Sequence, residues 1–378
     1  CPSVREEELE WLRRVVELPL IRSGTCQNVW ILGEKGVGKS ALQLYFMEEL
    51  RKKVADVDVV YVKLPAKGVA DIYRAFIYAL GVEYLIKLSV RLYCEYFKYR
   101  SYEKLYELCS QIRPKEARPE REVLRETIEK AIVNDEFLQQ VISGKGPLHI
   151  AALKKIADDM ADWLCAWYAV FRKVAKCLAN IAREPERQFS SLLRVRGAAD
   201  MADVIASIAR LAKKFLNKRA MLMIIDELEI AWDYLTTSAK NKFAVWLRNM
   251  VEASGGWIRI MMTYVPRRES IDALLSKYPH IADVLPFMPP GNVLIVEPLS
   301  YEKATELIAC YLSRERLEMV ENRIKPFEEE VIKELVLRKA GRTRDILYAC
   351  YVLIEHAAEK GVEKIDMGLL EEYETSIL

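Results

Sequence analysis

This 378-residue sequence lacks long apolar runs and closely paired cysteines, and its net charge is small. No apolar run reaches the roughly 18 residues that a membrane span needs, and no signal peptide is evident at the start. We therefore expect a cytoplasmic protein without a membrane partner. The net charge of +2 excludes a general polycation, so any nucleic-acid surface has to be local. The first residue is Cys1 rather than Met, which leaves the completeness of the N-terminus open.

The eight cysteines are scattered and contain no C-x-x-C pair. This spacing argues against a zinc site and favours cytosolic thiols that pack as small apolar groups. Glutamine and asparagine are few, whereas lysine, arginine and glutamate are abundant. That balance is typical of proteins from thermophiles, in which intracellular disulfides also occur.

A glycine-rich loop stands between an apolar strand at 28–32 and a segment of helical spacing at 40–53. The loop reads GEKGVGKS and fits the pattern G-x-x-x-x-G-K-[ST] in the order strand, loop, helix. Such a loop surrounds phosphates with its backbone N–H groups and with the positive N-terminus of the helix. The expected ATP contacts are Gly33, Glu34, Lys35, Gly36, Val37, Gly38, Lys39, Ser40 and Ala41. We expect Lys39 to reach the β- and γ-phosphates and Ser40 to bind Mg²⁺.

A second strand-like run, AMLMIID at 220–226, ends in the two carboxylates Asp226 and Glu227. We expect Asp226 to hold the magnesium shell and Glu227 to polarise the attacking water. A carboxylate after the Asp favours hydrolysis over transfer to a small substrate. This pair therefore disfavours a small-molecule kinase.

Two further residues are candidates for reading the γ-phosphate. Thr263 lies late in the apolar run 257–264, where it either positions the water or serves only as a strand former. Arg344 begins a helix in the segment GRTRDIL and either contacts the γ-phosphate or remains a solvated charge, with Arg342 as a competitor.

The sequence predicts an α/β fold with a five-stranded parallel sheet, because its apolar runs suit strands covered on both faces. The runs are 28–32, 57–64, 220–226, 257–264 and 292–296. Helical segments are expected at 5–18, 69–81, 84–112, 119–142, 150–183, 200–217, 236–254, 300–315, 326–340, 343–360 and 366–376. The predicted parts are a nucleotide-binding domain (1–66 and 218–297), a helical insertion (67–217) and a C-terminal helical lid (298–378).

In family order, these motifs resemble the AAA+ and STAND-type P-loop ATPases, in particular the archaeal ATPase and Orc1/Cdc6-like group. The resemblance includes the acidic opening at 5–9, the lid entry at 298–300 and the G-x-x-R of residues 341–344. It covers roughly 5–65 and 218–378 and implies catalytic roles for Lys39, Glu227, Thr263 and Arg344. ATP and Mg²⁺ are the implied cofactors.

The sequence departs from that group in two ways. It ends with the lid, so we expect no winged-helix domain, and the long insertion is not typical. The insertion and the D-E-L-E motif at 226–229 are similar to BREX-type and, loosely, TnsC-type ATPases. No arginine finger is clear. Arg267 and Arg268 are the nearest candidates, but they are better read as surface charges, and no ring is assumed.

The partner is left open by the sequence. Basic clusters at 113–125 and 213–219 either contact DNA or form solvated helix faces, and the tyrosine-rich stretch 93–106 either stacks bases or packs inside. The first hypothesis is an ATPase that acts on DNA or a DNA-bound protein complex in replication, transposition or defence. The alternative is a slow STAND-like switch that recruits a protein partner through the insertion, and either is compatible with a homo-oligomer.

Overall fold

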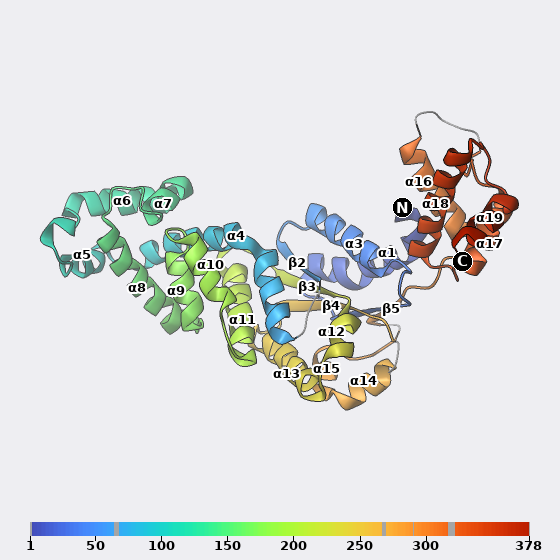
Figure 1. Ribbon diagram of the computed structural model, residues 1–378. Helices are drawn as coiled ribbons and strands as arrows, with labels where there is room; N and C mark the ends of the chain where they lie inside the picture. The colour runs from blue at the N-terminus through green and yellow to red at the C-terminus, as the bar shows by residue number, and fades with distance from the viewer. Residues whose placement is uncertain (1, 64–67, 267–269, 290, 317–321, 378) are drawn as a thin grey trace.

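The computed structural model describes residues 2–63, 68–266, 270–289, 291–316 and 322–377. At its centre lies a five-stranded sheet in the order β2-β3-β4-β1-β5, with all neighbouring strands parallel (Figure 1). The strands are β1 (Val29–Leu32), β2 (Val57–Lys63), β3 (Ala220–Asp226), β4 (Ile258–Tyr264) and β5 (Val293–Ile295). Each strand lies where an apolar run predicts it, and the expected α/β fold class is confirmed.

Alternate side chains of the strands enter two separate cores, one on each face of the sheet. In β1, Trp30 and Leu32 belong to one core, whereas Val29 and Ile31 belong to the other. Successive residues of a strand point to opposite faces. Because both faces are covered, the strands are mainly apolar rather than regularly alternating between apolar and polar residues.

The helix after the glycine-rich loop, α3 (Lys39–Lys53), packs on the face of Val29 and Ile31 together with the N-terminal segment. That segment contains η1 (Pro2–Arg5), α1 (Glu6–Leu12), the π-helical η2 (Arg13–Glu17) and α2 (Leu18–Ser23). It extends beyond the predicted 5–18 and ends at Gly24, which adopts the left-handed conformation.

The described residues between β2 and β3 are helical and extend from the opposite face of the sheet (Figure 1). The elements are α4 (Val69–Tyr99), α5 (Tyr102–Ser110), η3 (Lys115–Ala117), α6 (Arg121–Val133), α7 (Asp135–Ile142), α8 (Ile150–Tyr168), α9 (Arg172–Asn180), α10 (Pro185–Leu193) and α11 (Ala198–Phe215). Their apolar side chains share one continuous core with Trp30 and Val60 of the sheet. The insertion is therefore built onto the sheet face, while its exact boundaries stay a prediction.

Several predicted helices of the insertion are broken. The segment 119–142 is interrupted at Asn134, whose side chain accepts a hydrogen bond from the N–H of Phe137 and so begins α7. The segment 150–183 is interrupted at Ala169, which has a left-handed φ of 48°. Apolar periodicity continues across both points, so it does not reveal these local backbone choices.

The remaining helices lie around β4 and in the C-terminal part. They are α12 (Leu228–Tyr234), α13 (Thr237–Ala253), α14 (Ile271–Lys277), α15 (Pro279–Val284), α16 (Tyr301–Glu315), α17 (Glu329–Arg338), α18 (Thr343–Lys360) and α19 (Met367–Ile377). Helices α16 to α19 form a third core, which also takes in Val4 from the N-terminal segment. Figure 1 shows these four helices on the side of the sheet opposite to α5, α6 and α7.

Within the described ranges, no helix is both long enough and apolar enough to span a membrane. The cysteines of these ranges are free. No cluster of three or more His, Cys, Asp or Glu side chains there has the arrangement of a metal site.

Candidate nucleotide-binding site

The glycine-rich loop connects β1 to α3, and its backbone requires glycine. Gly33 has a φ of +149°, and a Cβ there would lie 2.5 Å from the carbonyl oxygen of Val296. Gly38, directly before α3, has a φ of +103°. Side chains are strained in this conformation, so the glycines at 33 and 38 allow the loop to turn tightly into the helix.

Lys39 is the first residue of α3 and is almost entirely buried. Its ammonium group donates hydrogen bonds of 2.8 Å to the carbonyl oxygens of Gly33 and Glu34. The positive charge is thus held over the loop, close to the backbone N–H groups at the start of α3. A phosphate at this helix N-terminus meets both the ammonium and the helix dipole.

Asp226 ends β3 and is held at both carboxylate oxygens. The hydroxyl of Tyr61 on β2 donates to Oδ2 at 2.6 Å, and the hydroxyl of Thr263 on β4 donates to Oδ1 at 2.7 Å. Burial, and then the neighbouring Asp226, raise the pKa of Tyr61, so its hydroxyl keeps the proton that it donates. Three adjacent strands therefore fix the orientation of this carboxylate.

Thr263 also fixes the backbone of the next residue. The N–H of Glu227 donates to Thr263 Oγ1 at 2.8 Å and to Asp226 Oδ1 at 3.0 Å. Glu227 has a left-handed φ of 59°, an uncommon conformation for this residue type. Its carboxylate is partly exposed and lies 3.9 Å from the ammonium of Lys63. The fully buried Thr263 thus connects the two carboxylates, and its contact with water stays a prediction.

Glu229, three residues after Asp226, adds another carboxylate to the site. The residue is 5% exposed, and its Oε2 has no hydrogen-bond partner among the residues that the structure describes. Burial raises the pKa of this carboxyl, while backbone N–H groups and the charge of Lys39 act in the opposite direction. A carboxylate of this kind is ready to accept a proton or a hydrogen bond from a ligand.

These groups converge on a cavity of about 370 Å³. It is lined by Lys35, Gly36, Gly38, Lys39, Ser40, Ala41, Leu44, Asp226, Glu227, Glu229, Tyr311, Thr343, Arg344 and Leu347. The cavity size is within the range of small-molecule sites. The N-terminus of α3 and that of the lid helix α18 both contribute to its wall.

The start of α18 contacts the glycine-rich loop directly. The N–H of Arg344 donates to Gly36 O at 3.0 Å, and the hydroxyl of Thr343 donates to Val37 O at 3.0 Å. Arg342 points instead to Glu34 on the outer side, at 3.3 Å. Arg344 lines the cavity and Arg342 does not, which distinguishes the two competing arginines.

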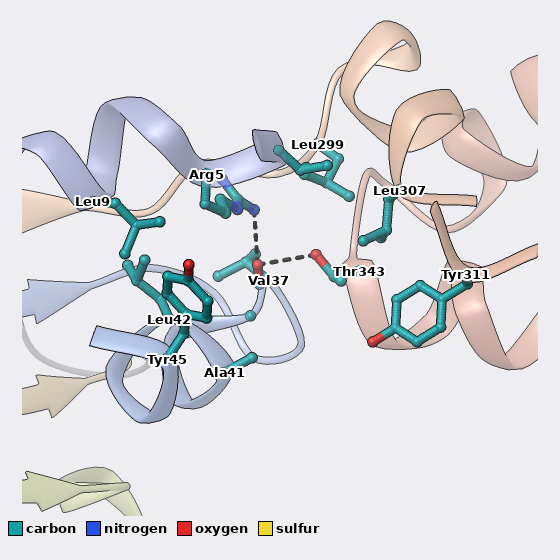
Figure 2. Close-up of a pocket in the computed structure, with 12 residues that line it drawn as sticks. Arg5, Leu9, Val37, Ala41, Leu42, Tyr45, Leu299, Leu307, Tyr311 and Thr343 are labelled. Carbon is teal, nitrogen blue, oxygen red and sulfur yellow. Dashed lines mark hydrogen bonds between the residues drawn. The ribbon is translucent and has the colours of Figure 1, made fainter. Parts of the chain in front are cut away.

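A smaller apolar pocket of about 100 Å³ adjoins the first (Figure 2). The two pockets share Gly38, Ala41, Tyr311 and Thr343. Other walls are Leu9 and Leu42 on one side and Leu299 and Leu307 of the lid on the other, as Figure 2 shows. An apolar pocket with a few polar groups beside a phosphate-type cavity suits a nucleotide base.

Arg5 connects the N-terminal segment to the same loop. Its guanidinium donates to Val37 O at 2.8 Å (Figure 2). It also donates to Glu8 Oε1 at 2.6 Å. Val37 O therefore accepts hydrogen bonds from both the N-terminal segment and the lid. Sequence reasoning found neither this pocket nor Tyr61, because only the fold brings their separate segments together. It placed Glu229 at the end of the D-E-L-E motif but gave this residue no role.

Comparison with known proteins gives weak structural likeness alone. No protein-family model matches the sequence, and no curated protein matches it. The chain is similar to the Aeropyrum pernix Orc1 protein, solved in complex with DNA, at 12% identity and a TM-score of 0.46. The match covers 99% of this chain and 65% of the Orc1 chain, so it spans less than two thirds of that protein. At this level the likeness adds nothing to the functional argument, which rests on the geometry above.

The basic cluster at 213–219 is engaged within the molecule. Lys213 lies over the ring of Trp257 and Lys214 over that of Tyr168. Lys218 pairs with Asp58 and Arg219 with Asp56. These contacts favour a structural reading of the cluster over a DNA contact.

Contacts in the cluster at 113–125 and in the tyrosine-rich stretch also favour structural roles over contact with DNA. In the cluster at 113–125, Arg121 covers the rings of Tyr102 and Tyr106, and Arg125 pairs with Glu129. Tyr93, Tyr96 and Phe97 are buried, which supports their reading as helix core. Arg267 and Arg268 lie outside the described residues.

Proposed function

We propose that this chain binds ATP with magnesium across the two adjoining pockets and hydrolyses it. The observation that carries the proposal is the convergence of three separate segments on one cavity. These are the glycine-rich loop with Lys39 and Ser40, the strand end with Asp226 and Glu227, and the lid helix with Arg344. The base occupies the apolar pocket between Leu42 and Leu307, and the phosphates lie at the N-terminus of α3.

Each side chain has a role that follows from its position. Lys39 stabilises charge on the β- and γ-phosphates, and Arg344 adds a second cation from the lid. Glu227 accepts a proton from the attacking water, because its carboxylate is the more exposed neighbour of the anchored Asp226. Tyr61 and Thr263 keep Asp226 oriented.

The residues present fit a magnesium ion. Ser40 supplies a hydroxyl and Asp226 a carboxylate on the same cavity wall, and oxygen ligands are those that magnesium prefers. When bound, the ion neutralises developing charge on the phosphate oxygens.

The contacts between the lid and the glycine-rich loop can couple the state of the bound nucleotide to the position of the lid. Because Gly36 O and Val37 O accept hydrogen bonds from α18, a change in the loop on hydrolysis alters the docking of the lid. We propose that this movement acts on DNA or a DNA-bound protein complex. The alternative is a slow switch that recruits a protein through the insertion, which the large helical surface between β2 and β3 supports.

The first test is the ATPase rate of Glu227→Gln. We expect the rate to fall about 100-fold to 10,000-fold, the usual contribution of a general base, while ATP binding is retained. Glu48→Gln is the matched control, because Glu48 is an exposed carboxylate on α3 that does not line the cavity. Unchanged turnover in Glu227→Gln overturns the catalytic assignment.

The second test separates the two functions. ATPase rates are measured with and without duplex DNA, and the mass of the particle is measured with a non-hydrolysable ATP analogue. Acceleration by DNA supports the DNA-directed ATPase, and the particle mass identifies any homo-oligomer that forms. A slow rate without DNA response, combined with ATP-dependent protein binding, supports the switch.

A further inference from the structure

Helices α9 and α10, with the residues that follow α10, are the most basic part of the insertion. Residues 172–196, which we call the basic hairpin, contain seven lysines and arginines but only two carboxylates. The cations are Arg172, Lys173, Lys176, Arg183, Arg187, Arg194 and Arg196. The local excess of positive charge is larger than the +2 of the whole chain, so the remainder of the molecule is net acidic.

Three of these cations are engaged with carboxylates. Arg172 pairs with Asp162 on α8 at 2.9 Å, while Arg183 and Arg187 lie at 4.0 and 3.0 Å from Glu184. The side chain of Arg183 is also largely buried. The first pair joins α9 to α8, and the other two reduce the net charge at the turn between α9 and α10.

The other four cations face solvent without such partners. Lys173, Lys176, Arg194 and Arg196 form no ion pair with any other residue in the part of the chain that the structure describes. Lys176, Arg194 and Arg196 are exposed, and Lys173 is half-buried. They contrast with the cluster at 213–219, whose cations are all used within the molecule.

The hairpin is held in a defined geometry. A short connection joins the two helices, and the thiol of Cys177 donates to Gln188 O across them at 3.6 Å. Arg187 on α10 and Arg194, the residue that caps the C-terminal end of this helix, are both exposed. Figure 1 places α9 and α10 in the middle of the insertion, between α8 and α11.

The apolar sides of the hairpin are already occupied. Val174, Leu178 and Leu192 are fully buried in the core of the insertion. The helices therefore have no free apolar face to insert into a lipid surface, which is how basic amphipathic helices bind membranes. What they expose is a series of separated single charges, with the half-buried Ser190 and Ser191 between Arg187 and Arg194.

We propose that the basic hairpin binds the phosphodiester backbone of a nucleic acid without reading its bases. Separated cations and hydroxyls are the groups that contact successive phosphates. The inference rests on the proposed function only in that DNA is chosen as the first probe. It does not require ATP hydrolysis, so the two can fail separately.

The experiment measures binding of the full chain to a fluorescent 30-base-pair duplex over a series of salt concentrations. Two variants each remove two charges, Lys173→Ala with Lys176→Ala and Arg194→Ala with Arg196→Ala. The matched control is Lys154→Ala with Lys155→Ala, an exposed pair on α8 that removes the same charge. We expect each hairpin variant to bind about 10-fold to 100-fold more weakly near 0.1 M salt, with a salt slope lower by roughly 1.8.

Further measurements identify which kind of nucleic acid is bound and check that the variants are folded. Single-stranded DNA and duplex RNA of equal length distinguish the kinds of nucleic acid. Basal ATP turnover of the hairpin variants should equal that of the unmodified protein, because none of the four residues lines the nucleotide cavity. If basal turnover is absent in all proteins while DNA binding still depends on the hairpin, the proposed hydrolysis fails and this inference stands.

Three results overturn the inference. The first is no binding to any of the three nucleic acids at low salt. The second is equal binding by the hairpin variants and the Lys154/Lys155 control. The third is equally hairpin-dependent binding to polyglutamate or to vesicles containing anionic lipid, which identifies an acidic protein or a membrane surface instead.

Discussion

At the scale of single residues, the site is organised by a few hydrogen bonds to Asp226. Tyr61 and Thr263 occupy its two oxygens, and Thr263 also accepts from the N–H of Glu227. Asp226 and Glu227 are neighbours in sequence, yet their side chains differ in burial and in orientation. Asp226 is buried and anchored, whereas Glu227 is turned outward by its left-handed backbone toward Lys63.

Glu229 gives a prediction about pH and stability at this scale. Its pKa is raised by burial, so the native state favours the protonated form relative to the unfolded chain. This carboxyl therefore favours folding most when it is protonated. Its contribution to the free energy of unfolding is fully present below the unfolded pKa and is lost as pH rises through the folded pKa. We therefore expect Glu229→Gln to raise the melting temperature at pH 7. This difference should shrink as pH falls through the folded pKa and should be gone near pH 4.5, the ordinary pKa of the carboxyl.

Thermal unfolding followed at both pH values checks this prediction. Glu48→Gln is again the control, because an exposed carboxylate should give no difference at either pH. A stabilisation by Glu229→Gln that stays constant with pH contradicts the role of the carboxyl charge. In that case shape or hydrogen bonding at this position has to explain it.

At the scale of elements, the lid is positioned on the glycine-rich loop where the segment before α18 packs against the segment that follows β5. Gly341 has a φ of +66°, and a Cβ there would lie 2.6 Å from the carbonyl oxygen of Leu299. The N–H of Leu299 also donates to Gly341 O at 2.8 Å. Close packing of two backbone segments at this point sets the position of Thr343 and Arg344.

We expect Gly341→Ala to destabilise the protein by about 1–3 kcal/mol, because it adds a clash to a strained backbone. Gly361→Ala is the matched control, since Gly361 has a φ of +68° but no atom within 4 Å of the added Cβ. That control should lose only about 1 kcal/mol or less through backbone strain alone. Urea unfolding measures both, and equal losses would show that the close approach to Leu299 is unimportant.

A second prediction at this scale concerns the hydrogen bond from Thr343 to Val37 O. Thr343→Ala removes about 0.5–1.5 kcal/mol of lid docking, so the first turn of α18 should exchange its amide hydrogens roughly fivefold faster. Thr305→Ala is the control, because that hydroxyl donates only to Tyr301 O within α16. Identical exchange in the two variants would mean that the loop does not hold the lid.

At the scale of the whole molecule, three apolar cores define how the parts move together. The insertion shares its core with one face of the sheet, whereas α16 to α19 have a core of their own. Elements with a common core unfold cooperatively, and a separate core can open by itself. The molecule is therefore expected to move as a lid against a combined sheet and insertion.

Hydrogen exchange measured by mass spectrometry tests this division. We expect α16 to α19 to exchange before β1, β3 and the buried helices of the insertion, which should exchange together. ATP with magnesium should slow exchange in α18 and in η1 by more than tenfold at saturation, because both contact the loop. Exchange of the insertion independently of the sheet would contradict the shared core.

Most of the fold could be predicted from the sequence, because its signals are local. The five strands appear as apolar runs, and the glycine-rich loop follows its strand directly. Helix breaks at Asn134 and Ala169 were not predictable from periodicity, since the apolar pattern continues through them. Helix α10 was missed inside the segment that follows 150–183, where a single Pro185 begins a new helix.

What the sequence determined by itself is the chemistry that is contiguous in the chain: the loop at 33–40 and the carboxylate pair at 226–227. Tertiary structure alone decided that Tyr61 holds Asp226, that Arg344 rather than Arg342 lines the cavity, and that Arg5 and Thr343 meet on Val37 O. It also decided which cations are used internally and which remain on the surface of the basic hairpin. The physical reason is that a motif is fixed by neighbouring backbone, whereas contacts between distant segments depend on strand order and helix packing.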